Sequence, residues 1–326
     1  MGEFELIDRF FLRPGRPAAE GVALGVGDDC ALLAPTPGQQ LAISSDMLLE
    51  GRHFLPTVDP DSLGHKALAV NLSDLAACGA RPLAFTLALA LPAADEAWLA
   101  AFSRGLFALA DAHGCTLAGG DTTRGPLAIC ITVFGEVPTG QALLRSGARP
   151  GDDIWVSGTL GDARLALEAL RGGLALPPAM LASVRERMDR PVPRLALGQA
   201  LRGIASAAID VSDGLLGDLG HLLRRSGAGA TLDTVAAQAL LAARRLPDAA
   251  ALPDAATQLE YVLAGGDDYE LAFTAPADRR GDVEAAAATC ATPVTRIGRV
   301  DTEPGVRLVG DGARADRPYR SFDHFG

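Results

Sequence analysis

Residues 204–227, IASAAIDVSDGLLGDLGHLLRRSG, run from an apolar strand through a turn with two aspartates into an amphipathic helix. The leucines of 215–227 have helical spacing and end at a glycine, which suits a helix C-terminus. Strand and helix follow one another in the same way at 84–92 and 95–114, and at 153–158 and 161–170. Strands that alternate with helices predict an α/β or α+β fold, and the order of the strands stays open.

The length predicts two domains, because a single hydrophobic core usually stops growing below 326 residues. The best boundary is 144–152, LRSGARPGD, where Gly, Pro and charged residues follow one strand and precede the next. We therefore predict a strand-rich N-terminal domain at 1–148 and a C-terminal α/β domain at 149–326.

The composition is that of a globular protein, with 48% hydrophobic and 21% charged residues. A net charge of −11 argues against a nucleic-acid partner, because binding a phosphate backbone requires concentrated positive charge. No segment approaches the roughly 20 apolar residues that span a bilayer, so no membrane partner is expected. Acids interrupt the apolar N-terminus, MGEFELIDRFF, so we expect no signal peptide and predict a cytoplasmic location.

The cysteines and the single lysine are interpreted as structural residues rather than as functional ones. The five cysteines lie beside apolar residues without a Cys-x-x-Cys pair, and we expect reduced, buried side chains. Lys66 is the only lysine, so a phosphate-binding lysine could be no other residue. Its position near a helix start favours a capping or solvated role instead.

An apolar strand that runs into Gly or Ser followed by Asp occurs five times. The segments are GVGDD (25–29), ISSD (43–46), LAGGD (117–121), AIDVSD (208–213) and LAGGDD (263–268). A sixth acid, Asp74, lies with Asn71 on one face of an expected helix at 62–79, for which Ser62 is the predicted N-cap. One such aspartate alone is usually a turn residue that bonds nearby amides. Six together favour a carboxylate site neutralised by cations, and Mg²⁺ suits these oxygen ligands.

Several common catalytic motifs are absent from the sequence. It contains no G-x-x-x-x-G-K-[ST], no G-x-S-x-G and no H-E-x-x-H, and G-x-G at 25–27 lacks the third glycine of a dinucleotide fingerprint. These absences argue against P-loop, hydrolase, zinc-protease and Rossmann chemistry. Of the reaction classes considered, phosphoryl transfer assisted by metal ions remains compatible with the sequence.

In their order and spacing, the segments resemble the thiamine-phosphate kinase family, which is related to aminoimidazole ribonucleotide synthetase. The resemblance covers nearly the whole chain and rests on GEFELI, GVGDDCALL, LAISSDMLLEGRHF, HKALAVNLSDLAACGARP, GGDTTRGPL, RSGARPGD, VSGTLGD, IDVSDGLLGDLGH, GGDDYEL and FDHF. It implies a two-domain aminoimidazole ribonucleotide synthetase-like fold, with an N-terminal domain that forms a shared β-barrel across a homodimer. It also implies ATP-dependent phosphorylation of thiamine monophosphate to thiamine diphosphate with several Mg²⁺ ions.

The resemblance implies a role for individual residues. The expected magnesium ligands are Asp29, Ser44, Ser45, Asp46, Asp74, Asp121, Asp210 and Asp213. The expected ATP contacts are Gly120, Asp121, Arg145 and Ser212. The expected substrate contacts are His53, Asp267 and Phe322, since a carboxylate and an aromatic face suit a cationic ring. The planar fork of Arg145 suits phosphate oxygens. The acceptor phosphate is already anionic, so no residue is expected to act as an acid or base.

Three positions depart from the family pattern. Asp267 stands where Glu is expected, Ser45 where Thr is common, and Phe322 where Tyr or Trp is expected. Other interpretations stay open for two of the substrate contacts. His53 could be a loop histidine without a partner, and Phe322 could anchor the tail in an apolar groove.

Two alternative functions also stay open. The first is a sister ATP-dependent synthetase that acts on another acceptor, such as a formylglycinamidine ribonucleotide. The second is a non-catalytic ATP-binding maturation partner, which would bind nucleotide without turnover. The acceptor that stimulates ADP release distinguishes all three functions.

Overall fold

The computed structural model describes residues 2–13, 20–311, 319, 321 and 322. The chain forms two compact units, Met1–Leu75 with Ala80–Gly140 and Ala76–Gly79 with Gln141–Gly326. The sequence placed the division after residue 148, whereas the contacts group residues 141–148 with the second unit. Each unit has its own sheet and core, as expected for an α/β or α+β protein of this length.

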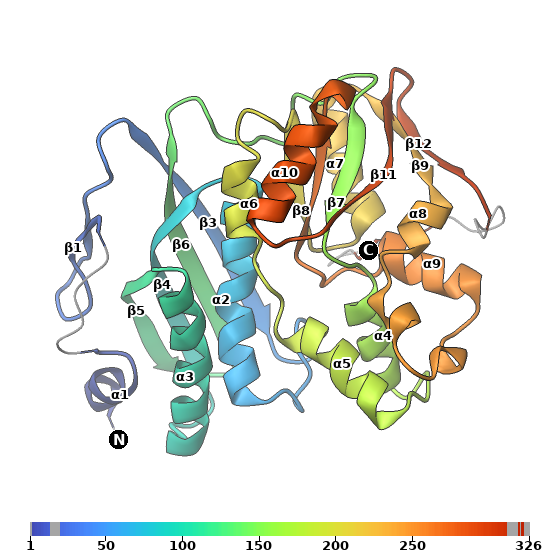
Figure 1. The fold of residues 1–326 in the computed structure, drawn as a ribbon. Coiled ribbons are helices and arrows are strands. Elements are labelled where there is room, and N and C mark those ends of the chain that lie inside the picture. Colours follow the sequence, from blue (N-terminus) through green and yellow to red (C-terminus); the bar gives the residue numbers. More distant parts are fainter. Residues whose placement is uncertain (1, 14–19, 312–318, 320, 323–326) are drawn as a thin grey trace. The chain divides into compact units, whose positions relative to one another are not determined.

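The N-terminal unit contains a four-stranded sheet with the order β3-β6-β4-β5. Its elements are α1 (Glu3–Phe10), β1 (Val22–Leu24), β2 (Leu32–Leu33), β3 (Gln39–Leu49), α2 (Pro60–Ala77), β4 (Arg81–Leu91), α3 (Glu96–Ala112), β5 (Thr116–Arg124) and β6 (Ala128–Pro138). β6 pairs antiparallel with β3 and β4, and β4 pairs parallel with β5. α2 and α3 cover one face of this open sheet (Figure 1). The two short strands at 22–34 are confirmed, whereas α1 was not predicted.

α2 and α3 pack with their backbones in contact. A Cβ on Gly64 would lie 2.0 Å from the Phe102 carbonyl oxygen, and one on Gly105 would lie 1.8 Å from that of Asp61. The predicted N-cap of α2 is wrong. The helix begins at Pro60, and the Asp59 carboxylate accepts the Ser62 N–H at 3.1 Å, because Asp caps well and Pro suits the first helical position.

The C-terminal unit contains a six-stranded sheet with the order β12-β9-β11-β7-β10-β8. Its elements are β7 (Asp153–Ser157), α4 (Asp162–Leu170), α5 (Pro178–Asp189), α6 (Leu195–Ala200), β8 (Ala207–Val211), α7 (Leu215–Ser226), β9 (Gly229–Asp233), α8 (Thr234–Gln238), α9 (Ala255–Ala264), β10 (Glu270–Ala275), α10 (Arg280–Thr289), β11 (Val294–Asp301) and β12 (Gly305–Val309). The β12–β9 pair is parallel and the others are antiparallel. The predicted strand and helix at 204–227 are confirmed as β8 and α7.

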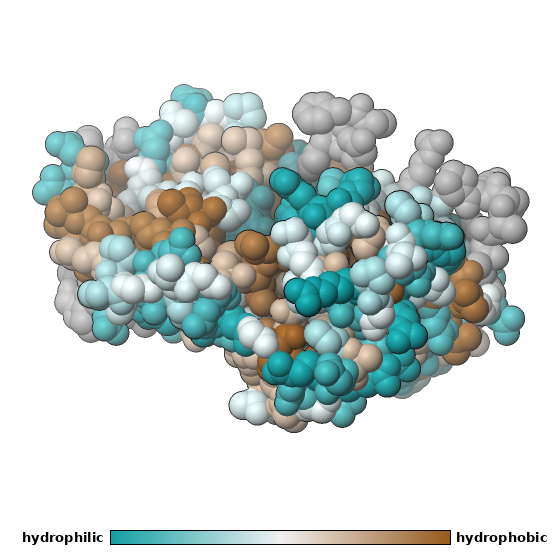
Figure 2. All heavy atoms as spheres, turned by 90° about the horizontal axis from the view of Figure 1, so that it is seen from above, coloured by the Kyte–Doolittle hydropathy of each residue, from teal (hydrophilic) through white to brown (hydrophobic). Residues whose placement is uncertain are grey.

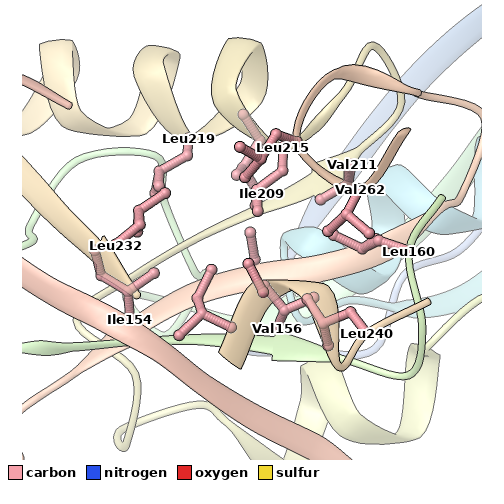
Figure 3. Close-up of a cluster of buried hydrophobic side chains, with 14 of the residues drawn as sticks. Ile154, Val156, Leu160, Ile209, Val211, Leu215, Leu219, Leu232, Leu240 and Val262 are labelled. Atoms are coloured by element: carbon pink, nitrogen blue, oxygen red, sulfur yellow. The ribbon is translucent and has the colours of Figure 1, made fainter. Parts of the chain in front are cut away.

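The core of the C-terminal unit fixes the junction of β8 and α7. Figure 3 shows Leu215 and Leu219 projecting from α7 toward the side chains of the sheet, including Ile209 of β8. Leu215 and Leu219 are fully buried, and Ile209 is 2% exposed. Burial of each such side chain contributes roughly 1.5–3 kcal/mol. The turn between β8 and α7 is therefore held at both ends by packed elements.

Two interpretations of single residues are wrong. Lys66 is only 2% exposed and lies inside α2, so it is not solvated at the helix start. Cys30 is exposed although a buried side chain was expected, whereas Cys115 is buried. In the described part of the chain, no helix has the length and apolar character needed to cross a membrane.

Candidate functional site

A cavity of about 650 Å³ in the N-terminal unit contains three of the predicted site residues, Asp29, Gly120 and Asp121. Its walls come from α1, the turn between β1 and β2, and strands β4 and β5. Asp8 and Asp28 also line it, and its described lining includes no basic side chain. Four carboxylates without a cation repel one another, so this cavity suits a ligand that brings positive charge.

The backbone beside Asp121 admits only glycine. Gly120 has φ +148°, and a Cβ there would lie 1.9 Å from the Leu87 carbonyl oxygen of the neighbouring strand. A side chain would therefore separate β4 from β5. The close approach of the strands brings Asp121 into the cavity.

A second group of predicted residues joins β3 to α2. The Ser44 hydroxyl donates a hydrogen bond to the Asp74 carboxylate, and the Asp46 N–H donates to the Asn71 side-chain oxygen at 3.0 Å. The predicted pairing of Asp74 and Asn71 on one helix face is confirmed by these contacts. Ser45 lies apart from them, with its hydroxyl 2.9 Å from that of Thr132 on β6.

These two groups lie on opposite edges of the N-terminal sheet. Asp46 pairs with Ile131, Ile131 with Leu87, and Leu87 with Gly120, so Asp46 and Gly120 lie in one row across the sheet. They occupy its two outer strands, which puts their Cα atoms three strand spacings apart, roughly 14 Å.

A third group lies in the turn between β8 and α7. Asp210 is the penultimate residue of β8 and is 5% exposed, while Ser212 and Asp213 form the turn itself. The N–H groups of Ser212, Asp213 and Gly214 all donate to Oδ2 of Asp218, at 3.0, 3.0 and 3.1 Å. Burial, and then the nearby charge of Asp213, raise the pKa of Asp218 to about 7, although the three N–H groups oppose this shift.

The same turn holds two predicted substrate residues through its carbonyl groups. The Asp267 N–H donates to the Ser212 oxygen at 2.7 Å, and the Phe322 N–H donates to the Asp213 oxygen at 3.0 Å. The Gly217 N–H also donates to the Ser321 hydroxyl oxygen at 2.9 Å. The Phe322 ring is 43% exposed. One short turn thus connects Ser212 and Asp213 with Asp267 and Phe322.

The conformation of Asp267 explains the residue type. It has φ +66°, a left-handed conformation that Asp adopts more readily than most other residues. Gly266 before it has φ +70°, and a Cβ there would lie 2.7 Å from the Ser212 oxygen. An Asp instead of the expected Glu therefore fits the local backbone, at the cost of a shorter reach.

Arg145 lies in the same neighbourhood as Asp213. Burial first, and then the charges of Arg224 and Arg145, lower the pKa of His221, while the Asp213 carboxylate acts in the opposite direction. The Arg145 carbonyl is 3.4 Å from the Ser226 hydroxyl at the end of α7. Arg145, Asp213 and His221 are thus close enough to interact electrostatically.

His53 is tied to the end of β3 in the N-terminal unit. Its Nδ1 accepts the Leu49 N–H at 3.0 Å, and the backbone N–H of His53 donates to the Leu49 carbonyl oxygen at 2.9 Å. The interpretation as a loop histidine without a partner is therefore wrong. Because Nδ1 is an acceptor, the neutral imidazole carries its proton on Nε2.

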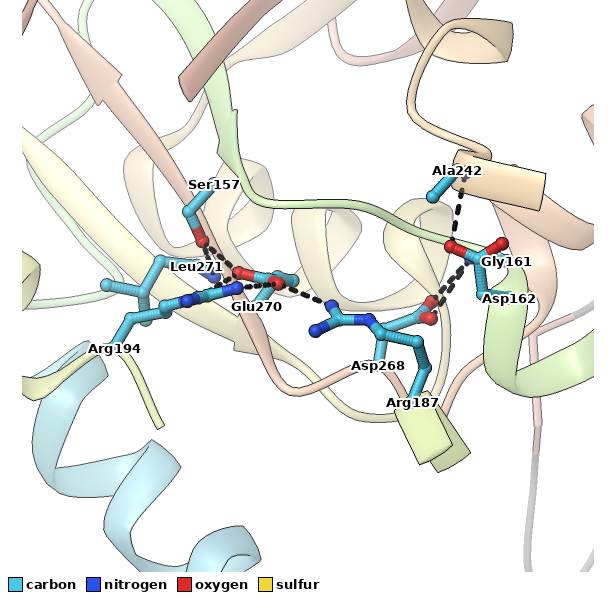
Figure 4. A network of polar contacts seen from close by, with 9 residues as sticks. All are labelled: Ser157, Gly161, Asp162, Arg187, Arg194, Ala242, Asp268, Glu270 and Leu271. Atoms are coloured by element: carbon cyan, nitrogen blue, oxygen red, sulfur yellow. Dashed lines mark hydrogen bonds and ion pairs between the residues drawn. The ribbon is translucent and has the colours of Figure 1, made fainter. Parts of the chain in front are cut away.

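A buried ionic network supports the loop that carries Asp267 (Figure 4). Glu270 is 1% exposed and accepts hydrogen bonds from the Ser157 hydroxyl at 2.6 Å, Arg187 at 2.8 Å and Arg194 at 2.5–2.6 Å. Burial acts to lower the pKa of Arg194, but the hydrogen bond to Glu270 and the charge of that carboxylate together outweigh burial and raise the pKa. Two residues before Glu270, the Asp268 carboxylate accepts the Gly161 N–H.

The structure thus brings the predicted residues together in three groups rather than one. In the described residues, no three His, Cys, Asp or Glu side chains lie close enough to form a metal site by themselves. Sequence reasoning missed Asp218, Glu270, Arg187 and Arg194. The available signal for Asp218 was an acid in the first turns of α7. The available signal for Glu270 was a charged residue at the start of an apolar strand.

Two family models match the chain. The AIR synthase related protein, N-terminal domain, matches residues 27–137, and the AIR synthase related protein, C-terminal domain, matches residues 149–311. Both matches agree with the resemblance stated from the motifs.

Individual proteins match over nearly the full length. The thiamine-monophosphate kinase of Salmonella typhimurium is 48% identical, over 99% of this chain and 98% of the relative. The crystal structure of thiamine-monophosphate kinase from Stenotrophomonas maltophilia K279a has 48% identity and a TM-score of 0.81, over 90% of this chain and 93% of that one. A structure described as AaThiL complexed with AMPPCP and TMP has 29% identity and a TM-score of 0.74, over 90% and 89%.

Proposed function

The chain belongs to the thiamine-monophosphate kinase family of AIR synthase related proteins, and from this premise we propose how its residues phosphorylate thiamine monophosphate. The reaction transfers the γ-phosphoryl group of ATP to the phosphate of thiamine monophosphate, giving thiamine diphosphate and ADP. The related structure in complex with AMPPCP and TMP supports ATP as the nucleotide and thiamine monophosphate as the acceptor.

The chemistry requires no protein acid or base. An anionic oxygen of the acceptor phosphate attacks the γ-phosphorus, and the bond from this phosphorus to the bridging oxygen of ADP breaks in line with the new bond. No proton moves at the reacting atoms. The residues therefore act by positioning the two phosphates and by balancing charge.

The oxygen donors of the three groups fit Mg²⁺. We assign as its ligands Asp29, Ser44, Ser45, Asp46, Asp74, Asp121, Asp210 and Asp213. The acid-rich cavity without basic lining residues supports this assignment, and so does the hard-oxygen chemistry of the donors. The separation of Asp46 from Gly120 supports more than one ion. When bound, Mg²⁺ neutralises the triphosphate and polarises its oxygens.

The remaining residues bind the two substrates. We assign Gly120, Asp121, Arg145 and Ser212 to ATP, and His53, Asp267 and Phe322 to thiamine monophosphate. The exposed ring of Phe322 offers a face for a cationic ring, and Asp267 offers a negative charge. The observation that carries the assignment is the turn Ser212–Gly214, because its hydrogen bonds join residues assigned to ATP with residues assigned to the acceptor.

A coupled assay of ADP release tests the function against its alternatives. We expect ADP release to depend on thiamine monophosphate and not on thiamine or pyridoxal phosphate, because the site must align an acceptor phosphate beside a thiazolium ring. Release that depends on a formylglycinamidine ribonucleotide would favour the sister synthetase. Nucleotide binding without turnover on any acceptor would favour a maturation partner.

We also propose a homodimer built on the outer face of β3, in which the two N-terminal sheets form a shared β-barrel. β3 is an edge strand whose Leu41, Ile43, Met47 and Leu49 are 43%, 59%, 55% and 39% exposed. These alternate residues form an apolar stripe on one side of the strand, which suits a second sheet. Hydrophobic patches are visible on the face drawn in Figure 2.

The use of ATP supports a cytoplasmic location.

Sedimentation analysis tests the dimer. The double substitution Ile43→Lys and Met47→Lys is expected to convert a dimer to a monomer, because it would bury two charges in the interface. Val309→Lys is the matched control, since Val309 is 59% exposed on the edge strand β12 of the other sheet. A wild-type monomer, or a double variant that stays dimeric, would contradict the proposed interface.

A further inference from the structure

We propose that Asp218 is a positioning residue for phosphoryl transfer, which orders both the nucleotide-binding and the substrate-binding residues of the C-terminal unit without touching either ligand. This inference rests on the proposed function and adds to it a residue that no motif had singled out. It acts through the turn Ser212–Gly214.

The Asp218 carboxyl group is enclosed by backbone N–H groups. One carboxylate oxygen accepts three successive N–H groups, and Asp218 is 5% exposed. Successive N–H groups aimed at one oxygen fix the backbone that carries them, because changing any of its dihedrals breaks a hydrogen bond. The turn is therefore held in one conformation.

An ordinary helix cap is not available at this position. Gly214, the N-cap of α7, has φ +118°, and a Cβ there would lie 2.9 Å from the backbone of Ala264. A Ser or Asp at the cap is thus excluded, although it would be the usual acceptor for the first N–H groups. Asp218 does not replace that cap, because it accepts the N–H groups of the turn that precedes the helix. In the first turn of α7, the Gly217 N–H donates to the Ser321 hydroxyl instead.

The side chains of the turn remain available to ligands. Within the described residues, neither the Ser212 hydroxyl nor the Asp213 carboxylate forms a hydrogen bond or a salt bridge. The main chain of the turn is fully hydrogen-bonded, whereas its polar side chains form no hydrogen bond with the part of the protein that the structure describes. That combination is expected of a preorganised binding site, in which a rigid backbone presents side chains to a ligand.

The effect of Asp218 extends to the acceptor side. The Ser212 and Asp213 carbonyls hold the N–H groups of Asp267 and Phe322. A turn that loosens would release these two residues along with its own side chains. Loss of Asp218 is therefore expected to weaken nucleotide binding and to lower kcat, and not only to reduce stability.

Asp162 provides a matched control. It is 1% exposed, and its carboxylate accepts the N–H groups of Ala242 and Ala243 at 3.2 and 2.9 Å. The bonds anchor a segment that contains no residue assigned to either ligand. Asp162→Ala and Asp218→Ala thus remove similar buried hydrogen bonds, and only the second one touches the binding turn.

The test combines calorimetric titration with Mg²⁺·AMPPCP, steady-state kinetics and thermal unfolding. Both variants are measured below their unfolding temperatures. Asp218→Ala is expected to weaken Mg²⁺·AMPPCP binding at least about tenfold and to lower kcat by a similar factor. Asp218→Asn is expected to have an intermediate effect, because its side chain keeps a hydrogen-bond acceptor. Asp162→Ala is expected to lower Tm while both quantities change less than about twofold. If Asp218→Ala does not fold, Asp218→Asn is compared with Asp162→Asn, with at least about threefold weaker binding expected for the former.

Unchanged binding and kcat in the folded Asp218 variants would overturn the proposal, and so would equal losses in the Asp162 variants. Failure of the proposed function would look different, because the wild type would then fail to phosphorylate thiamine monophosphate. The titration with Mg²⁺·AMPPCP does not depend on turnover and would still report whether Asp218 orders the turn.

Discussion

Asp121→Asn is expected to lower kcat about 1,000-fold and to leave the fold intact. Asp121 is exposed in the cavity on β5, so the isosteric amide removes its charge without disturbing packing. The free energy of unfolding is expected to change by less than about 0.5 kcal/mol. The large kinetic effect follows because removal of one group that stabilises transition-state charge typically costs 100- to 1,000-fold, and here the group is also assigned to the metal.

Steady-state ADP release and thermal unfolding measure the two effects of Asp121→Asn. Asp8→Asn is the control, because Asp8 lines the same cavity from α1 and has no assigned role. It is expected to change kcat less than about threefold. A rate near that of the wild type for Asp121→Asn would remove Asp121 from the metal ligands, and an equal loss for Asp8→Asn would show a general charge effect.

Glu270→Ala is expected to destabilise the protein by about 3–5 kcal/mol, because it leaves two arginines without their buried partner. Arg194 and Arg187 have side chains only 14% and 27% exposed, and both donate to this one carboxylate. For a chain of this size the loss corresponds to a decrease in Tm on the order of 10 °C. The Ser157 hydroxyl, which links Glu270 to the Leu271 N–H, would lose its acceptor as well.

Thermal unfolding measures the effect of Glu270→Ala directly. Glu168→Ala is the control, because Glu168 forms a partly exposed pair with Arg164 one helical turn away. Such pairs contribute about 0.5 kcal/mol or less. If the two variants lowered Tm equally, the buried network in Figure 4 would not be a main source of stability.

Much of the secondary structure could be predicted from the sequence because its signals are local. The leucines of 215–227 and the glycine after them identify α7, and the strand and turn of 204–214 precede it. The N-cap of α2 was misjudged because Ser62 and Asp59 are both good capping residues three positions apart. Sheet order could not be predicted, since it depends on pairings between strands far apart in the chain.

The candidate site was only partly predictable for the same reason. Glycine next to aspartate marks turns such as Gly120–Asp121, and the positive φ of the glycine explains that pattern. The position of Glu270 at the start of an apolar strand did not identify its partners, because Ser157, Arg187 and Arg194 lie 76 to 113 residues away. The role of Asp218 depends on backbone geometry, which residue spacing does not reveal.

The fate of the γ-phosphorus of ATP tests the central claim most directly. With γ-labelled ATP, thiamine monophosphate and Mg²⁺, we expect the label to appear in thiamine diphosphate with one ADP formed per product. Chelation of Mg²⁺ is expected to stop the transfer. Label found only in inorganic phosphate, or transfer that continues at the same rate in excess EDTA, would contradict it.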